Sequence, residues 1–210
     1  MKGYNKSVME RLKILKKKLK AKKNSIRKSK NQEKKKVYIL LTRFPDNGSK
    51  VIQALTGSFY THASIGLCED MNIFYSFVVK GFIVEEITRY IKPDRAPFPC
   101  QLYEIEVSDK VYRAVKKLIE HFKERKHHMS YTRFGLVMSL LRIPFKRKDN
   151  YFCSQFVAEI LKRAEVAKLK KFTVLYLPGD LSKLSEIKLV FEGNLQSFIT
   201  HFGIQQPSLA

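Results

Sequence analysis

The chain has 210 residues, a hydrophobic content of 44% and a formal net charge of +22. Length and composition predict one domain with a hydrophobic core, together with a charged tail. Three cysteines without paired spacing argue against a disulfide framework or a zinc site and favour a reducing compartment. No signal-peptide pattern and no apolar run long enough to span a bilayer is visible. We therefore expect a cytoplasmic protein, free or peripheral at the inner face of the membrane.

The first 36 residues differ from the rest in charge. They contain sixteen basic and two acidic residues, so they carry +14 of the net charge of +22. Four apolar residues recur at helical spacing between the lysines: Val8, Leu12, Leu15 and Leu19. We predict a basic tail over 1–36, helical or disordered, and a folded domain over 37–210. The tail is either simply solvated or contacts an anionic membrane surface. Nucleic acid is the weaker partner, because Tyr4 is the one aromatic residue among the basic ones.

The folded part begins with strands and continues with helices. Period-two and apolar patterns predict strands over 37–42, 61–67, 73–79, 81–85, 101–107 and 187–191, and a short helix over 49–55. Because strands and helices cluster instead of alternating, we predict the α+β class, with an antiparallel sheet packed against helices.

The helices of the second half carry clearer signals. Apolar residues at i, i+3, i+4, i+7 and i+8 predict a helix over 111–122, with Ser108 as its N-cap. The stretch 134–141 predicts a mainly apolar helix, which we assign to the core; the alternative is the wall of an acyl-chain pocket. An amphipathic helix is predicted over 153–164, and shorter helical turns after Pro178 and over 195–201.

One cysteine and one histidine stand in positions typical of nucleophilic chemistry. Cys153 lies at the first turn of a predicted helix, where free N–H groups and the helix dipole favour a thiolate. His62 lies on a predicted strand upstream. A thiolate and an imidazole are the two groups that cysteine-type acyl transfer requires. The alternative is that both are ordinary core residues.

Four stretches in this order resemble the circularly permuted NlpC/P60 amidases, the papain-like YaeF/YiiX-like group. In ordinary members the cysteine helix precedes the histidine strand; here, as in permuted members, the order is reversed. The similar stretches are 37–42 with 51–57, Thr61-His62-Ala63-Ser64-Ile65-Gly66, Tyr151-Phe152-Cys153-Ser154-Gln155-Phe156-Val157, and Leu177-Pro178-Gly179-Asp180-Leu181. Together they extend over about three-quarters of the chain and leave out the basic tail. The resemblance implies a permuted papain-like fold.

The resemblance also implies roles for individual residues. Cys153 would be the nucleophile and His62 the general base. Family members place a polar residue that orients the histidine on the next strand, and there Ser76 is the first candidate, Tyr75 the second. Glu85 on the neighbouring segment is a third possibility. A serine would orient the histidine weakly.

The expected function is that of a cysteine hydrolase, an amidase, peptidase or acyl esterase, that forms an acyl-enzyme on an amide- or ester-containing substrate. The alternative is a non-catalytic binding or adaptor module on a papain-like scaffold, suggested by the lack of an acid next to the histidine strand. We expect no cofactor and no metal, since the adjacent His127 and His128 on a helix cannot face one ion. Oligomeric state and exact bond type stay open.

Overall fold

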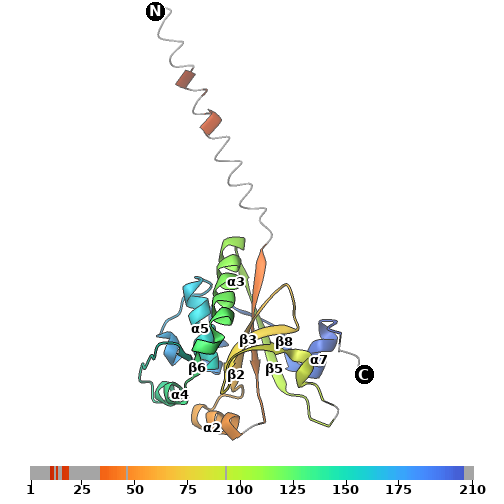
Figure 1. Cartoon of the computed structure of the whole chain (residues 1–210). Helices are drawn as coiled ribbons and strands as arrows, with labels where there is room; N and C mark the ends of the chain where they lie inside the picture. Colours follow the sequence, from red (N-terminus) through yellow and green to blue (C-terminus); the bar gives the residue numbers. More distant parts are fainter. Residues whose placement is uncertain are drawn as a thin grey trace, which may run out of the picture. The chain divides into compact units, whose positions relative to one another are not determined.

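The computed structural model describes residues 10, 11, 13, 16–18, 34–45, 47–92 and 94–205 (Figure 1). The chain divides into two units, residues 1–34 and 35–210. In the first unit the described residues 10, 11, 13 and 16–18 are helical and exposed. Lys34 is described as well and is exposed, and the last two positions of the predicted tail, Lys35 and Lys36, already belong to the first strand. The rest of the predicted tail lies outside the described residues.

The second unit is built on a six-stranded antiparallel sheet, so the α+β prediction is confirmed at this level. The strand order is β4-β3-β2-β1-β5-β8. The strands are β1 (Lys35–Thr42), β2 (His62–Leu67), β3 (Ile73–Val78), β4 (Gly81–Glu86), β5 (Pro99–Val107) and β8 (Lys188–Asn194). A separate parallel pair joins β6 (Ser130–Tyr131) and β7 (Asn150–Tyr151), two short strands that were not predicted.

The sheet is covered by helices on both faces. Residues 37–41 of β1 form a continuous apolar run, as expected for a strand that is buried on both faces. Ile39 packs into one hydrophobic cluster and Leu40 into the other. The first cluster includes α3 (Asp109–Glu124) and α5 (Cys153–Arg163). The second includes η1 (Ile87–Tyr90) and α7 (Leu195–His201).

The predicted start of α3 is confirmed. The Ser108 hydroxyl accepts a hydrogen bond from the Val111 N–H at 3.3 Å, which is the N-cap geometry. The apolar stripe of α3 then faces the sheet and α5, where Phe122 packs edge-on against Phe156 with ring centroids 4.9 Å apart. This contact fixes α5 between α3 and the sheet.

α5 differs from the amphipathic helix that its sequence predicts. Residues 153–161 are all buried, so the helix has no solvent face over its first two and a half turns. The buried Glu159 is stabilised by an ion pair with Lys146 at 3.2 Å and a hydrogen bond from Thr173 at 2.9 Å. Burial on all sides makes α5 a central element of the domain and holds its N-terminus in place.

The remaining helices are shorter than α3 and α5, and Figure 1 shows α2 and α4 at the same end of the domain. They are α2 (Asn47–Thr56), η2 (Lys126–His128), α4 (Arg133–Leu140), η3 (Thr173–Leu175) and α6 (Pro178–Leu181). The assignment of 134–141 to the core is wrong: Phe134, Val137 and Leu141 are at least half exposed. Among the residues that the structure describes, no helix has the length and apolar character needed to cross a bilayer.

Gly179 explains how α6 can approach the segment that follows α2. A Cβ at this position would lie only 2.7 Å from the Ser58 hydroxyl, so a larger residue would push the two segments apart. The Leu177 N–H donates to the Asp180 carboxylate at 2.8 Å and fixes the start of α6. This Pro-Gly-Asp turn thus supports the loop that leads into β2.

Candidate active site

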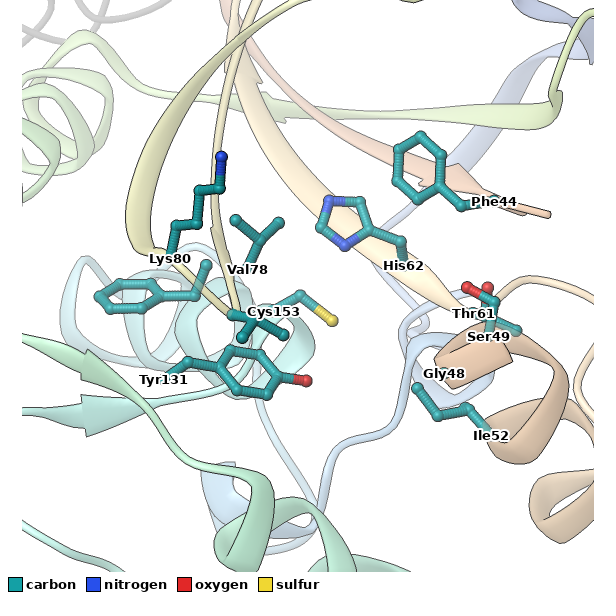
Figure 2. A pocket seen from close by; sticks show the side chains of 12 residues that line it. Phe44, Gly48, Ser49, Ile52, Thr61, His62, Val78, Lys80, Tyr131 and Cys153 are labelled. Carbon is teal, nitrogen blue, oxygen red and sulfur yellow. The ribbon is translucent and has the colours of Figure 1, made fainter. Parts of the chain in front are cut away.

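The structure brings Cys153 and His62 to one pocket. Cys153 is the first residue of α5 and His62 the first of β2. Both side chains line a pocket of about 350 Å³ (Figure 2). Each residue is only 5–6% exposed, yet each is open to this pocket rather than sealed in the core. The two residues predicted to act together are therefore neighbours in space.

Glu85 completes the arrangement around the histidine. Its carboxylate accepts a hydrogen bond from His62 Nε2 at 2.6 Å, and its side chain is 2% exposed. This bond uses Nε2, so Nδ1 is the ring nitrogen left to interact with Cys153. A carboxylate in this position fixes the tautomer of the imidazole and stabilises its protonated form.

A cluster of aromatic side chains packs around the His62–Glu85 pair. The Phe44 ring lies 5.1 Å from the His62 ring and 5.3 Å from the Tyr90 ring, between centroids. Phe98 packs edge-on against Phe44 at 5.2 Å. The Tyr90 hydroxyl also interacts with Glu85: burial, followed by the charge and hydrogen bonding of Glu85, raises the pKa of Tyr90. The low-dielectric surroundings strengthen the interaction between His62 and Glu85.

The electrostatics of the site favour a charged pair. Burial alone would lower the pKa of His62, but the charge of Glu85 and hydrogen bonding to Cys153 and Glu85 outweigh it, so the pKa rises to about 10. Burial alone would raise the pKa of the Cys153 thiol. Hydrogen bonding to His62 and its positive charge reverse that effect, and the pKa falls below the ordinary 9.0. Both shifts favour an imidazolium beside a thiolate.

Backbone N–H groups add to the stabilisation of the sulfur. The N–H groups of Ala63 and Ser154 lower the pKa of Cys153 by hydrogen bonding to its sulfur. The first intrahelical bond of α5 runs from the Phe156 N–H to the Phe152 carbonyl, so the N–H groups before Phe156 have no acceptor within the helix. The N–H of Cys153 is one of these and lies beside the reactive atom.

The structure corrects the assignment of Ser76 as the orienting residue. Ser76 is fully buried, and its hydroxyl donates to the Ala63 carbonyl at 2.7 Å. It thus links β3 to β2 and supports the backbone next to His62. Tyr75 stacks against Phe82, with ring centroids 6.4 Å apart. Of the three candidates left open by the sequence, Glu85 is the one that contacts the imidazole.

The walls of the pocket are mainly apolar. Ile52 of α2, Val78 at the end of β3 and Val79 of the β3–β4 turn contribute aliphatic side chains. Lys80 contributes a cation (Figure 2). The Thr61 hydroxyl is buried and has no hydrogen-bond partner among the described residues, although Thr61 lines the pocket. A carbonyl compound with an apolar acyl part fits such a lining.

The other cysteines and histidines are not part of this site. Cys100 is fully buried on β5, and burial raises its pKa to about 12, which is opposite to the shift at Cys153. Cys68 is half-buried and donates to the Tyr112 hydroxyl at 3.4 Å. His127 and His128 are exposed in η2, beyond the end of α3. Within the described residues, no group of three His, Cys, Asp or Glu could hold a metal ion.

The comparisons with known proteins give no family for this chain. No model of a known protein family matches it, and no curated protein matches it. The site is therefore assigned from its geometry.

Proposed function

We propose that residues 35–210 form a cysteine hydrolase that cleaves an amide or ester bond through an acyl-enzyme. The observation that carries this proposal is the Glu85 carboxylate hydrogen-bonded to the His62 imidazole, with Cys153 lining the same pocket as His62. A structural role for these three residues would not need a thiol with a lowered pKa at the wall of a pocket.

The residues support a complete reaction. The Cys153 thiolate attacks the substrate carbonyl carbon, and the carbonyl π electrons move to its oxygen. The imidazolium of His62 then protonates the leaving nitrogen or oxygen, which departs and leaves a thioester. Neutral His62 takes a proton from water, and the resulting hydroxide attacks the thioester. The second tetrahedral species expels the thiolate and releases the carboxylic acid. Glu85 stabilises the positive charge of His62 both in the formation of the thioester and in its hydrolysis.

The oxyanion of each tetrahedral species requires a hydrogen-bond donor. The N–H of Cys153 at the first turn of α5 is suitably placed, because it lacks an intrahelical acceptor and lies at the positive end of the helix dipole. The burial of residues 153–161 of α5 fixes this N–H before substrate arrives. Such preorganisation is what makes an oxyanion donor effective.

We further propose that the domain has the permuted papain-like fold. In support, the histidine strand β2 comes before the cysteine helix α5 in sequence, and both pack in the same hydrophobic cluster. The adaptor alternative was suggested by the lack of an acidic partner for the histidine. Since Glu85 occupies that position, nothing in the site favours the adaptor over the hydrolase.

The experiment is a hydrolysis assay on a panel of chromogenic amides and esters with short and medium acyl chains. We expect wild-type protein to release product and to accumulate a thioester at Cys153, detectable by mass spectrometry after acid quench. Cys153→Ala should abolish both signals, whereas Cys68→Ala, at a half-buried cysteine outside the site, should keep them. Full hydrolysis by Cys153→Ala would contradict the proposal.

A further inference from the structure

Exposed apolar side chains gather on α2 and α4. Eleven large hydrophobic residues are exposed in the described chain, and six of them belong to these two helices and the turn after α4. We call this group the α2–α4 surface; its apolar members are Val51, Leu55, Phe134, Val137, Leu141 and Ile143. They are 46–65% exposed. Such a concentration marks a surface that contacts something apolar.

The C-terminal ends of the two helices lie next to each other. On α4, Phe134, Val137 and Leu141 follow the i, i+3, i+7 spacing of a single stripe. Leu55 of α2 lines the same hollow as Arg142, just beyond α4, so the ends of the two helices are adjacent. Figure 1 shows both helices at the same end of the domain. The apolar side chains can therefore meet one partner together.

The charges on the two segments that carry these side chains have a single sign. Segments 47–60 and 130–148 contain no Asp or Glu, and they contain six basic residues: Lys50, Arg133, Arg142, Lys146, Arg147 and Lys148. All six are exposed, and Lys146 is paired with Glu159. Apolar side chains interleaved with cations match the boundary of an anionic bilayer, where acyl chains lie beneath negatively charged headgroups.

We propose that the α2–α4 surface docks on an anionic lipid bilayer, with its apolar side chains inserted at the headgroup boundary. Each cation near the surface adds about fivefold to the affinity. A second copy of the chain is a poor partner, because a two-fold contact would bring the same cations together. Nucleic acid is also disfavoured, because aliphatic side chains give its phosphates and bases little to bind.

This docking goes beyond the proposed hydrolysis and does not depend on it. The α2–α4 surface is also distinct from the basic segment 1–36, whose predicted contact with an anionic membrane is a separate expectation. The surface adjoins the candidate active site, because Ile52 of α2 and Tyr131, two residues before α4, line the pocket. A docked membrane would consequently lie close to the pocket.

The test uses the full chain, which contains no tryptophan. Leu141→Trp places a single reporter on the α2–α4 surface, and Leu189→Trp places a matched one on β8, where Leu189 is 43% exposed. With phosphatidylcholine vesicles that contain phosphatidylserine, we expect a blue shift at position 141 and quenching by brominated acyl chains. Position 189 should show neither, and vesicles of phosphatidylcholine alone should give a much weaker response.

A second measurement addresses affinity. Leu55→Ser combined with Leu141→Ser should weaken cosedimentation with the same anionic vesicles at least about tenfold, and Leu189→Ser should leave it unchanged. Cosedimentation without quenching at position 141 would assign binding to residues 1–36 and overturn the proposal. A response at 141 to polynucleotide or to an acidic protein, and not to vesicles, would overturn it as well. Cys153→Ala should bind vesicles as wild type does, so loss of the catalytic proposal leaves this result intact.

Discussion

Replacing Glu85 by glutamine removes the charge that supports His62 and leaves the shape of the side chain. The carboxylate is 2% exposed and accepts from Nε2 at 2.6 Å, so solvent hardly screens the interaction. A hydrogen bond to a charged partner contributes about 1.5–3 kcal/mol. At 1.36 kcal/mol for each factor of ten, Glu85→Gln should slow the reaction of Cys153 between about tenfold and about 150-fold at neutral pH.

The sign of the pH effect follows from the two pKa shifts. In wild type the pKa of His62 is raised to about 10 and that of Cys153 is lowered, so we expect an imidazolium beside a thiolate at neutral pH. Without the Glu85 charge, His62 loses its proton at lower pH and the pKa of Cys153 rises. The pH profile of thiol alkylation should then shift to higher pH in Glu85→Gln.

The assay is the second-order rate of iodoacetamide alkylation at Cys153 as a function of pH, which requires no knowledge of the substrate. Ser76→Ala is the matched control: it removes the hydrogen bond to the Ala63 carbonyl and should cost about 1 kcal/mol of stability, with little change in the profile. If Ser76→Ala shifted the profile and Glu85→Gln did not, the assignment of the orienting residue would be refuted. Circular dichroism of both variants serves as the check that they fold.

Three further results are expected. At neutral pH, Cys153 should react with iodoacetamide faster than a free peptide thiol and Cys100 should stay unmodified, as peptide mass spectrometry can show; equal labelling of both would contradict the opposite pKa shifts. The pH profile of kcat/KM should be bell-shaped, with an acid limb below pH 9 set by Cys153 and an alkaline limb near pH 10 set by His62. An alkaline limb near pH 6.5 would show that Glu85 does not raise the pKa of His62. Phe44→Ala should expose the His62–Glu85 pair to water, because the Phe44 ring packs against His62. We expect kcat/KM to fall several-fold and the free energy of unfolding in urea to fall by about 2 kcal/mol. No change in either quantity would show that Phe44 has no role in the site.

The helices and strands of this domain can be predicted from the sequence better than their burial in the fold. The apolar run of β1, the apolar stripe of α3 and the position of Ser108 as the N-cap of α3 are clear patterns in the sequence, so these features were predictable. The full burial of α5 was not, because the alternation of polar and apolar residues around Glu159 also fits a surface helix. The burial of that carboxylate depends on Lys146 and Thr173, which only the folded chain brings together.

The candidate site shows the same limit. Cys153 and His62 stand out because their residue types and local elements match a known chemistry. Glu85 was one of three alternatives, since strand order decides which polar group meets the imidazole. A glutamate on an inward-facing strand position is a usable signal, because a buried carboxylate requires a partner. The exposure of Phe134 and Leu141 could not be read from an apolar stretch, which looks alike in a core and on a membrane-facing surface.

The most direct test of the charged pair is the ultraviolet absorbance of the Cys153 thiolate, taken as the difference between wild type and Cys153→Ala during a pH titration. We expect the thiolate signal to persist well below pH 9 and to be lost in Glu85→Gln at neutral pH. A thiol that ionises only at pH 9 or above would show that no charged pair forms, and the proposed nucleophile would have no basis.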